Sequence, residues 1–170
     1  MRRLVAAKSE QELRVSVCIP AHDEEATVGG VVGKIRRWLV DRVGLVDEVL
    51  VVDDHSGDRT AAVAEAAGAR VVSAADVLSD VAGGSGKGEA LWRSLYAARG
   101  DIVLWCDADI SDFGSRFIVG LLGPLLTEPG VQYVKGFYER PLAERDRLRP
   151  TGGGRVTELV ARPLLNMFWP

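Results

Sequence analysis

The stretch that decides the fold is Asp101-Ile-Val-Leu-Trp-Cys106, which runs directly into Asp107-Ala108-Asp109. An apolar run that ends in two carboxylates one residue apart predicts a buried strand with both acids at its carboxyl end. In an open α/β sheet, ligands bind at that edge. A solvated turn after the strand is the structural alternative, because Asp is common in turns. The pair suits Mg²⁺, which takes one or two protein carboxylates and completes its shell with substrate phosphates, so the stretch indicates a metal–diphosphate site.

Strands and helices alternate along the rest of the chain. Apolar runs predict strands, and 3.6-residue spacing predicts helices. The strands are expected over Arg14–Pro20, Val46–Val52, Ala69–Ser73 and Asp101–Cys106, and the helices over Glu24–Val40, Thr60–Ala67, Glu89–Ala98 and Arg155–Phe168. This order predicts an α/β fold with a mostly parallel sheet covered by helices on both faces. Three tryptophans fit the apolar faces and are expected in the core: Trp38, Trp92 and Trp105.

Composition narrows the class of protein. The chain has 170 residues, 47% of them hydrophobic, which suffices for one good core. Its net charge is −3, and residues 1–134 carry 14 basic against 20 acidic side chains, which argues against a nucleic-acid surface. No apolar run reaches the roughly 18 residues of a membrane span. Cys18 and Cys106 lie in predicted buried strands and are expected to be reduced thiols of a cytoplasmic protein.

Two loops follow the first two predicted strands and carry further acids. Pro20-Ala21-His22-Asp23-Glu24-Glu25 could lie against a nucleotide, or its acids could simply favour the next helix start. Val52-Asp53-Asp54-His55-Ser56-Gly57-Asp58 ends a strand at the same sheet edge, with Ser56 or Asp58 as an alternative helix cap. The Asp54 carboxylate could accept a hydrogen bond from a base N–H, and both guanine and uracil offer one.

Two glycine-rich segments precede predicted helices. Gly83-Gly84-Ser85-Gly86-Lys87-Gly88 lacks the spacing of a P-loop, but its glycines permit close backbone approach and Lys87 could neutralise a phosphate. Thr151-Gly152-Gly153-Gly154-Arg155-Val156-Thr157 places free N–H groups, a guanidinium and a hydroxyl at a helix start, which suits an anion. A flexible loop and a hinge are the respective alternatives.

Taken together, these motifs resemble nucleotide-sugar glycosyltransferases of the GT-A fold. Two long motifs, over residues 86–95 and 151–165, are similar to those of the glucosyl-3-phosphoglycerate and mannosyl-3-phosphoglycerate synthases, and the resemblance covers residues 15–165. It implies a retaining enzyme that moves glucose or mannose from a nucleoside-diphosphate sugar to the 2-hydroxyl of 3-phosphoglycerate, with Mg²⁺ or Mn²⁺ as cofactor. The product is a precursor of glycosylglycerate compatible solutes or of methylglucose polysaccharides.

The resemblance also assigns roles to residues. It implies donor binding by Pro20, Ala21, Glu24, Lys87, Asp107 and Ala108, and the loop residues His22 and Asp54 are expected to contact the donor as well. It gives metal binding to Asp109 and Asp107, with Asp109 and Lys87 as the catalytic pair, and acceptor binding to Gly154, Arg155 and Thr157. Because His22 and Asp54 stand where some relatives have other residues, uracil and guanine both remain open as the donor base.

The resemblance divides the chain into three parts: an N-terminal extension over 1–14, a nucleotide-sugar-binding domain over 15–134, and the start of an acceptor-binding region over 135–170. Family members are nearly twice as long and are expected to be homodimers, so the sequence is expected to be truncated at its carboxyl end. Two alternatives remain: a polyprenyl-phosphate glycosyltransferase of the same fold, and a truncated, non-catalytic chain that binds nucleotide sugars.

Overall fold

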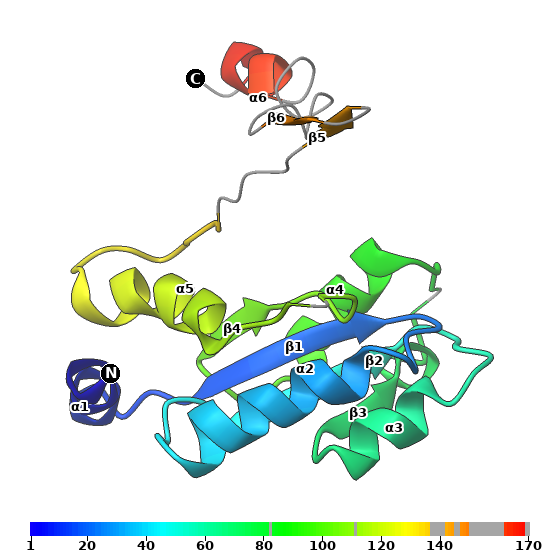
Figure 1. The fold of residues 1–170 in the computed structure, drawn as a ribbon, viewed down its shortest axis with the longest axis horizontal. Coiled ribbons are helices and arrows are strands. Elements are labelled where there is room, and N and C mark those ends of the chain that lie inside the picture. Colours follow the sequence, from blue (N-terminus) through cyan, green and yellow to red (C-terminus); the bar gives the residue numbers. More distant parts are fainter. Residues whose placement is uncertain (82, 111, 137–141, 145–146, 150–161, 169–170) are drawn as a thin grey trace. The chain divides into compact units, whose positions relative to one another are not determined.

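The computed structural model describes residues 1–81, 83–110, 112–136, 142–144, 147–149 and 162–168. The chain divides into two compact units, Met1–Val134 and Lys135–Pro170. The first unit contains the sheet and its helices, and Figure 1 labels its elements in chain order.

Four parallel strands form the sheet of the first unit. They are β1 (Val15–Ala21), β2 (Glu48–Asp53), β3 (Arg70–Ser73) and β4 (Ile102–Trp105), in the order β3-β2-β1-β4. β1 pairs with β2 on one side and with β4 on the other, so the strand order reverses between them. A ligand crevice is expected at the carboxyl ends where such a reversal occurs. The predicted parallel sheet is confirmed.

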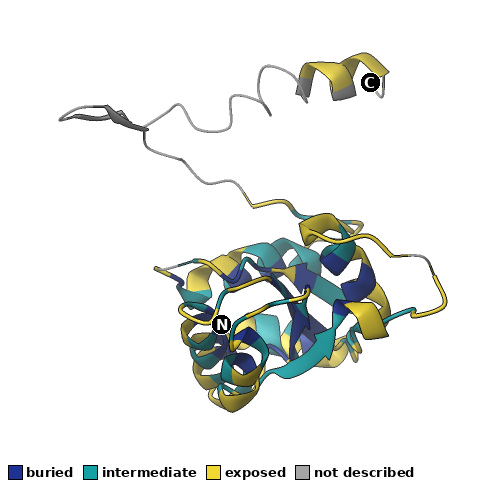
Figure 2. Cartoon of the chain, turned by 90° about the vertical axis from the view of Figure 1, so that its right-hand side faces the viewer, coloured by how far each residue is buried: buried dark blue, intermediate teal, exposed yellow. Residues whose placement is uncertain are grey.

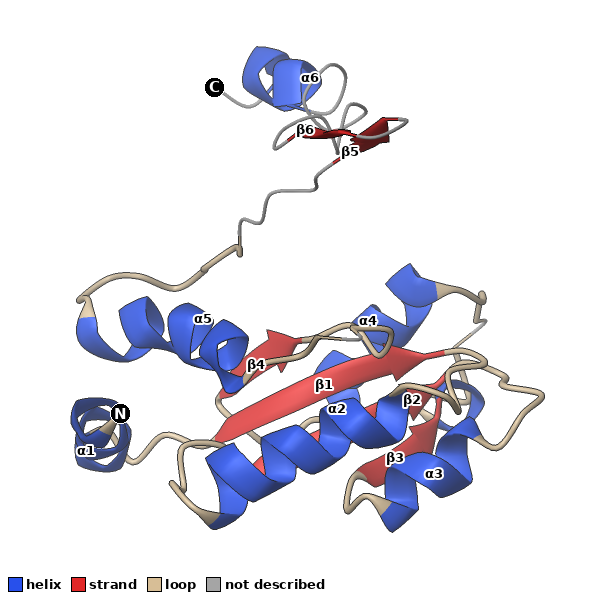
Figure 3. Ribbon diagram, in the orientation of Figure 1, coloured by secondary structure: helices blue, strands red, loops and turns tan. Residues whose placement is uncertain are grey.

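Alternate residues of the strands face two separate cores. Val15, Val17 and Ile19 of β1 pack with residues of α2 (Val28–Ile35) and α5 (Ser115–Thr127). Cys18 faces the opposite side, where Ala90 of α4 (Lys87–Ala97) closes the second core. Helices therefore cover both faces of the sheet, as predicted (Figure 3), and the buried residues gather along the strands and on the inward sides of the helices (Figure 2).

Several helices differ from the prediction. The helix expected from Glu24 begins at Val28. The Glu24 N–H donates to the Thr60 hydroxyl and the Glu25 N–H to the Asp58 carboxylate, so these residues connect to the next loop and helix. Two further helices were not predicted: α5, and α1 (Arg2–Glu10) within the expected N-terminal extension. The remaining helical elements are α3 (Thr60–Ala66), the π-helical turn η1 (Arg36–Asp41) that continues α2, and the 3₁₀ turn η2 (Ala74–Asp76).

The three tryptophans expected in the core are not there. Trp38, Trp92 and Trp105 are 43%, 37% and 44% exposed, so this prediction is wrong. Trp105 lies on β4, which pairs only with β1 among the described strands and leaves the indole on an open edge. Its Nε1 donates to Ser94 Oγ at 3.0 Å, which explains how a large ring is held there without burial. The two cysteines, by contrast, are free thiols and buried, as predicted.

The carboxylate of Glu48, whose side chain is 10% exposed, lies at the amino end of the sheet. Glu48 accepts hydrogen bonds from the Ser16 hydroxyl at 2.5 Å, from Arg70 Nε at 2.8 Å and from the Arg99 N–H at 2.9 Å. Burial acts to raise the pKa of Glu48, but these hydrogen bonds outweigh it and lower the pKa below its ordinary value. Gly100 donates to the same Ser16 hydroxyl at 2.9 Å, so β1, β2 and the turn before β4 meet at one point.

The second unit contains an antiparallel pair, β5 (Leu142–Glu144) and β6 (Arg147–Arg149), and the helix α6 (Arg162–Phe168). The helix predicted over Arg155–Phe168 is described from Arg162 onward, and its earlier residues lie outside the described residues. Across the described part of the chain, no helix is both long and apolar enough to cross a membrane.

Candidate functional site

A cavity of about 550 Å³ opens at the carboxyl edge of the sheet. The strand ends and loops after β1, β2 and β4 contribute to its wall, together with the start of α4. Its lining residues are Pro20, Ala21, His22, Glu24, Asp54, His55, Ser85, Gly86, Lys87, Ala90, Asp107, Ala108 and Asp109. This is the position where an open α/β sheet binds ligands.

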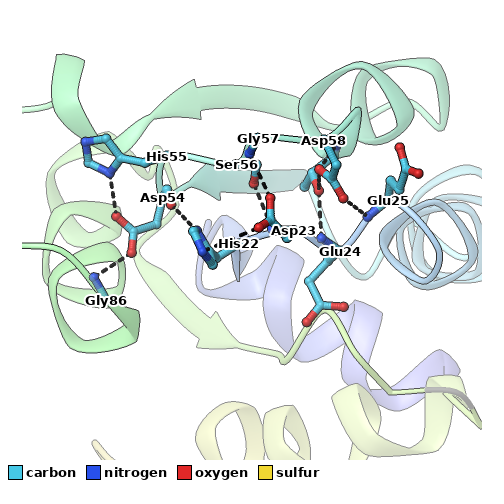
Figure 4. Close-up of polar contacts among 11 residues, drawn as sticks. His22, Asp23, Glu24, Glu25, Asp54, His55, Ser56, Gly57, Asp58 and Gly86 are labelled. Carbon is cyan, nitrogen blue, oxygen red and sulfur yellow. Dashed lines mark hydrogen bonds and ion pairs between the residues drawn. The ribbon is translucent and has the colours of Figure 1, made fainter.

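The loops after β1 and β2 are joined by reciprocal hydrogen bonds (Figure 4). The Asp23 N–H donates to Ser56 Oγ at 3.0 Å, and Asp23 Oδ1 accepts from the Gly57 N–H at 2.7 Å. Asp23 and His55 both adopt positive φ, 55° and 59°, which non-glycine residues rarely do. The cross-loop bonds stabilise that geometry, so the two loops form one rigid rim.

The same rim continues over the next residues. Asp58 Oδ2 accepts from the Glu25 N–H at 3.0 Å, and Asp58 Oδ1 accepts from the Thr60 N–H at 2.8 Å. Hydrogen bonds, first of all that from the Thr60 hydroxyl, lower the pKa of Asp58. The Glu24 side chain points away from the facing loop (Figure 4) and lines the cavity instead. Neighbouring acids in this loop thus divide between holding the rim and facing the cavity.

His22 reaches back across the rim to the β2 loop. Its Nδ1 donates to the Asp54 carbonyl oxygen at 2.6 Å, which fixes the proton on Nδ1, and its Nε2 lies 3.6 Å from Asp23 Oδ2. This hydrogen bond, aided by the nearby carboxylates of Asp23, Asp54 and Asp53, raises the pKa of His22 above its usual value. The imidazole is exposed and lines the cavity, so it can present positive charge to an anion.

Asp54 is the buried acid of the site, with a side chain only 6% exposed. Its Oδ1 accepts from His55 Nδ1 at 2.9 Å, and its Oδ2 accepts from the Gly86 N–H at 2.5 Å (Figure 4). A buried carboxylate needs such partners to offset the loss of water. Asp54 therefore connects the end of β2 to the glycine-rich segment that precedes α4.

Lys87 is the first residue of α4 and reaches the loop after β4. Its Nζ lies 2.6 Å from Asp107 Oδ1, and both side chains are about half exposed. An ammonium at this position offers a compact positive charge beside the cavity, which suits a phosphate group. The structure thus brings Lys87 and Asp107, two residues predicted for the site, into direct contact.

Asp109 lies at the exposed end of the cavity wall. Among the described residues it forms no hydrogen bond or ion pair, so its carboxylate is open to a cation. No group of three or more His, Cys, Asp or Glu side chains within the described ranges could hold a metal ion by itself. Mg²⁺ needs only one or two carboxylates when a substrate phosphate completes its shell, and the residues present fit that arrangement.

Cys106 lies directly before the aspartates but offers no nucleophile. Burial, with the charges of Asp107 and Asp109, raises the pKa of its thiol to about 12. Burial likewise raises the pKa of the Cys18 thiol to about 12. Thiols with such pKa values stay protonated near neutral pH, which does not favour either cysteine as a nucleophile.

All the residues predicted to bind donor or metal line the one cavity. The sequence prediction did not include four other lining residues: His55, Ser85, Gly86 and Ala90. All four lie within motifs identified from the sequence, but no pattern there distinguished a cavity-facing residue from its neighbours. The residues predicted to bind the acceptor, Gly154, Arg155 and Thr157, lie outside the described residues.

Comparison with known protein families defines the class. The model of glycosyl transferase family 2 matches residues 16–151, and the chain belongs to this family. It is 53% identical over 170 residues to the glucosyl-3-phosphoglycerate synthase of Mycolicibacterium paratuberculosis, covering 98% of this chain and 50% of that protein. The chain spans about half the length of the curated relatives it matches.

Solved structures confirm the predicted GT-A fold. Mannosyl-3-phosphoglycerate synthase from Rubrobacter xylanophilus superposes with a TM-score of 0.85 at 46% identity, over 98% of this chain and 51% of that one. Glucosyl-3-phosphoglycerate synthase from Mycobacterium tuberculosis was solved in complex with Mn²⁺, UDP-glucose and phosphoglyceric acid. It superposes with a TM-score of 0.81 at 50% identity, over 98% of this chain and 54% of that one. The latter protein has also been solved with Mg²⁺ and UDP.

Proposed function

We propose that this protein provides the donor site of a retaining hexosyltransferase that glycosylates 3-phosphoglycerate. The observation that carries the proposal is the single cavity that brings the predicted donor and metal residues together at the carboxyl edge of the sheet. The similarity to two 3-phosphoglycerate glycosyl synthases supports the same substrates. The donor would be UDP-glucose, or another nucleoside-diphosphate glucose, or GDP-mannose.

The donor would bind with its nucleoside against the β1 and β2 loops and its diphosphate toward α4. Pro20, Ala21, His22 and Glu24 line the first side of the cavity, and Lys87, Asp107 and Ala108 line the other. Lys87 would shift from its ion pair with Asp107 to share its charge with the diphosphate. Charge on the departing nucleoside diphosphate would thereby be stabilised as it develops.

Asp109, with Asp107, would hold the divalent cation, Mg²⁺ or Mn²⁺. The open carboxylate of Asp109 at the cavity wall supports this assignment. The cation supplies charge neutralisation for the diphosphate when it is bound. Gly154, Arg155 and Thr157 would hold the carboxylate and phosphate of 3-phosphoglycerate, on the basis of their motif at a glycine-rich helix start.

In the reaction, the acceptor 2-hydroxyl forms a bond to the anomeric carbon while the bond from that carbon to the diphosphate oxygen breaks. The acceptor attacks on the face from which the phosphate departs, so the anomeric configuration is retained, and the hydroxyl proton passes to the departing phosphate. The raised pKa values of the two buried thiols do not favour either as a nucleophile, and positioning would supply most of the rate enhancement.

Two further properties are part of the proposal. The buried free thiols support a reducing compartment, the cytoplasm. The family resemblance supports a homodimer.

Calorimetry with UDP, GDP and UDP-glucose, with and without Mg²⁺, tests the donor site directly. We expect Mg²⁺-dependent binding of one nucleotide that Asp109→Ala weakens at least tenfold, as loss of a charged ligand group implies. Asp112→Ala is the matched control, because Asp112 is an exposed acid of the same loop that does not line the cavity. Equal affinities in the parent protein and Asp109→Ala would contradict the metal assignment.

A further inference from the structure

Arg93 is a buried cation of α4 whose guanidinium faces the segment that connects β3 to this helix. The residue is 3% exposed. Its Nε donates to Glu89 Oε1, one helical turn earlier, at 2.7 Å, and the Glu89 side chain is itself mostly buried. Removing one member of a buried ion pair leaves the other charge uncompensated, so each side chain depends on its partner. The pair is therefore fixed in place on α4.

The same guanidinium holds the beginning of the connecting segment. Its Nη1 donates to the Ala74 carbonyl oxygen at 3.0 Å and also to the Val77 carbonyl oxygen. Both carbonyls belong to the turn directly after β3. A planar guanidinium can serve these carbonyls and the Glu89 carboxylate together, because its donors point in fixed and separate directions. Arg93 thus connects α4 to the end of β3.

The far end of the connecting segment also lies against the ion pair. A Cβ on Gly83 would collide with Arg93 Nη2, and a Cβ on Gly84 would lie 3.8 Å from Glu89 Oε2. Since the other contacts of Arg93 fix its side chain, Nη2 cannot swing aside without breaking them. The backbone at Gly83 therefore approaches the guanidinium more closely than a residue with a side chain would permit.

The connecting segment leads directly into the donor cavity. Ser85, Gly86 and Lys87 follow it and line that cavity. A second cavity of about 210 Å³ borders the segment, and its lining residues are His55, Ala74, Ala75, Ser79, Val81, Gly83, Gly84 and Arg93. His55 lines both cavities, so the two are adjacent. Because the segment borders open space there, its course depends on the contacts that Arg93 makes at its two ends.

We propose that Arg93 is a positioning residue for the donor site, which holds both ends of the connecting segment and so places Lys87 beside the donor diphosphate. Arg93 acts through this segment, since it does not itself line the donor cavity. Glu89 contributes by compensating the charge of Arg93. The inference rests on the proposed function, because it presumes a nucleoside diphosphate in the cavity.

A double-mutant cycle with Lys87 distinguishes positioning from a general loss of structure. Dissociation constants for UDP and GDP, each with Mg²⁺, are measured by calorimetry on the parent protein, Arg93→Lys, Lys87→Ala and the double variant. Lysine keeps a positive charge for Glu89 but lacks the fork that serves both carbonyls. We expect Arg93→Lys to weaken the preferred nucleotide about tenfold in the parent, but less than about twofold when Lys87 is already alanine. A general loss of structure would weaken binding equally in both backgrounds.

Arg70→Lys is the matched control. Arg70 also donates to a carboxylate and to a backbone carbonyl, those of Glu48 and Ala97, but it lines neither cavity. We expect this variant to leave nucleotide affinity unchanged. Gly83→Ala tests the contact from the other side with Arg93 intact, and it keeps the test decisive if urea denaturation shows Arg93→Lys to be unfolded. Gly83→Ala should also weaken the nucleotide, with the same dependence on Lys87.

The inference is overturned if Arg93→Lys and Gly83→Ala leave nucleotide affinity unchanged. It is also overturned if they weaken binding equally with and without the Lys87 ammonium, or if Arg70→Lys weakens it as strongly. A parent protein that binds neither UDP nor GDP with Mg²⁺ would instead overturn the proposed function itself.

Discussion

Lys87 Nζ lies 2.6 Å from Asp107 Oδ1, joining the start of α4 to the loop after β4 across the candidate donor site. Both side chains are about half exposed, so solvent screens the pair. Such a pair contributes little to folding and leaves the ammonium free to exchange partners when a phosphate arrives. We therefore expect the Lys87–Asp107 contact to affect ligand binding more than the free energy of unfolding.

Replacing Lys87 separates these two effects. We expect Lys87→Ala to weaken UDP binding at least about tenfold, while the free energy of unfolding changes by less than about 1 kcal/mol. Calorimetry and urea denaturation measure the two quantities. Arg37→Ala is a matched control, since Arg37 is an exposed cation outside the cavity. A large loss of stability in Lys87→Ala, with UDP affinity retained, would reverse this assignment.

Gly100 marks the tightest backbone approach at the amino end of the sheet. A Cβ on Gly100 would lie 2.6 Å from the Ser16 backbone nitrogen and 2.9 Å from the Arg14 carbonyl oxygen. Because backbone atoms cannot swing aside, Gly100→Ala should destabilise the protein by about 1–3 kcal/mol in urea denaturation. Gly120→Ala in α5 is the control: its Cβ would meet nothing within 4 Å and should be neutral or stabilising. Equal stabilities of the two variants would contradict the described packing.

The lowered pKa of Glu48 predicts how stability depends on pH. A carboxyl group whose pKa is lower in the folded than in the unfolded state contributes stability above its unfolded pKa, and this is lost as pH falls through the folded pKa. Glu48→Gln should therefore be less stable than the parent at neutral pH. The difference in free energy of unfolding should shrink steadily below about pH 4.3, the ordinary Glu value. A difference that stays constant from pH 7 to pH 3 would refute the assignment.

The raised pKa of His22 predicts a pH dependence of donor binding. The hydrogen bond from Nδ1 to the Asp54 carbonyl, with Asp23, Asp54 and Asp53 nearby, favours the imidazolium above its usual 6.5. Since the imidazolium attracts an anion, affinity for UDP-glucose should decline as pH rises through this pKa. UDP-glucose is the right probe because it has no ionisable phosphate near neutral pH. His22→Gln should flatten the profile, and an unchanged slope in that variant would exclude His22 as its source.

Much of the first unit follows from local patterns in the sequence. Buried parallel strands are continuous apolar runs, so β1, β2 and β4 can be predicted from the sequence. Their shared carboxyl edge brings Pro20, Asp54 and Asp107 to one cavity. The spacing of Ile118, Leu122 and Leu126, all buried, indicated the missed helix α5.

Other features depend on tertiary contacts that no local pattern specifies. The exposure of Trp105 follows from the place of β4 at one side of the described sheet. The engagement of Asp54 by Gly86, 32 residues away, follows from how the glycine-rich segment folds back onto β2. Sequence spacing could bring these residues to the same edge, but it could not show which carboxylates face the ligand and which hold the backbone.

Sugar transfer to 3-phosphoglycerate is the direct test of the proposed activity. The protein and Asp109→Ala are incubated with Mg²⁺, 3-phosphoglycerate and, separately, UDP-glucose, GDP-glucose and GDP-mannose, and products are identified by mass spectrometry. We expect a hexosyl-3-phosphoglycerate from one donor that is lost in Asp109→Ala. If turnover requires residues outside this sequence, we expect Mg²⁺-dependent binding of that donor with the same loss. The absence of both sugar transfer and metal-dependent donor binding would contradict the proposed activity.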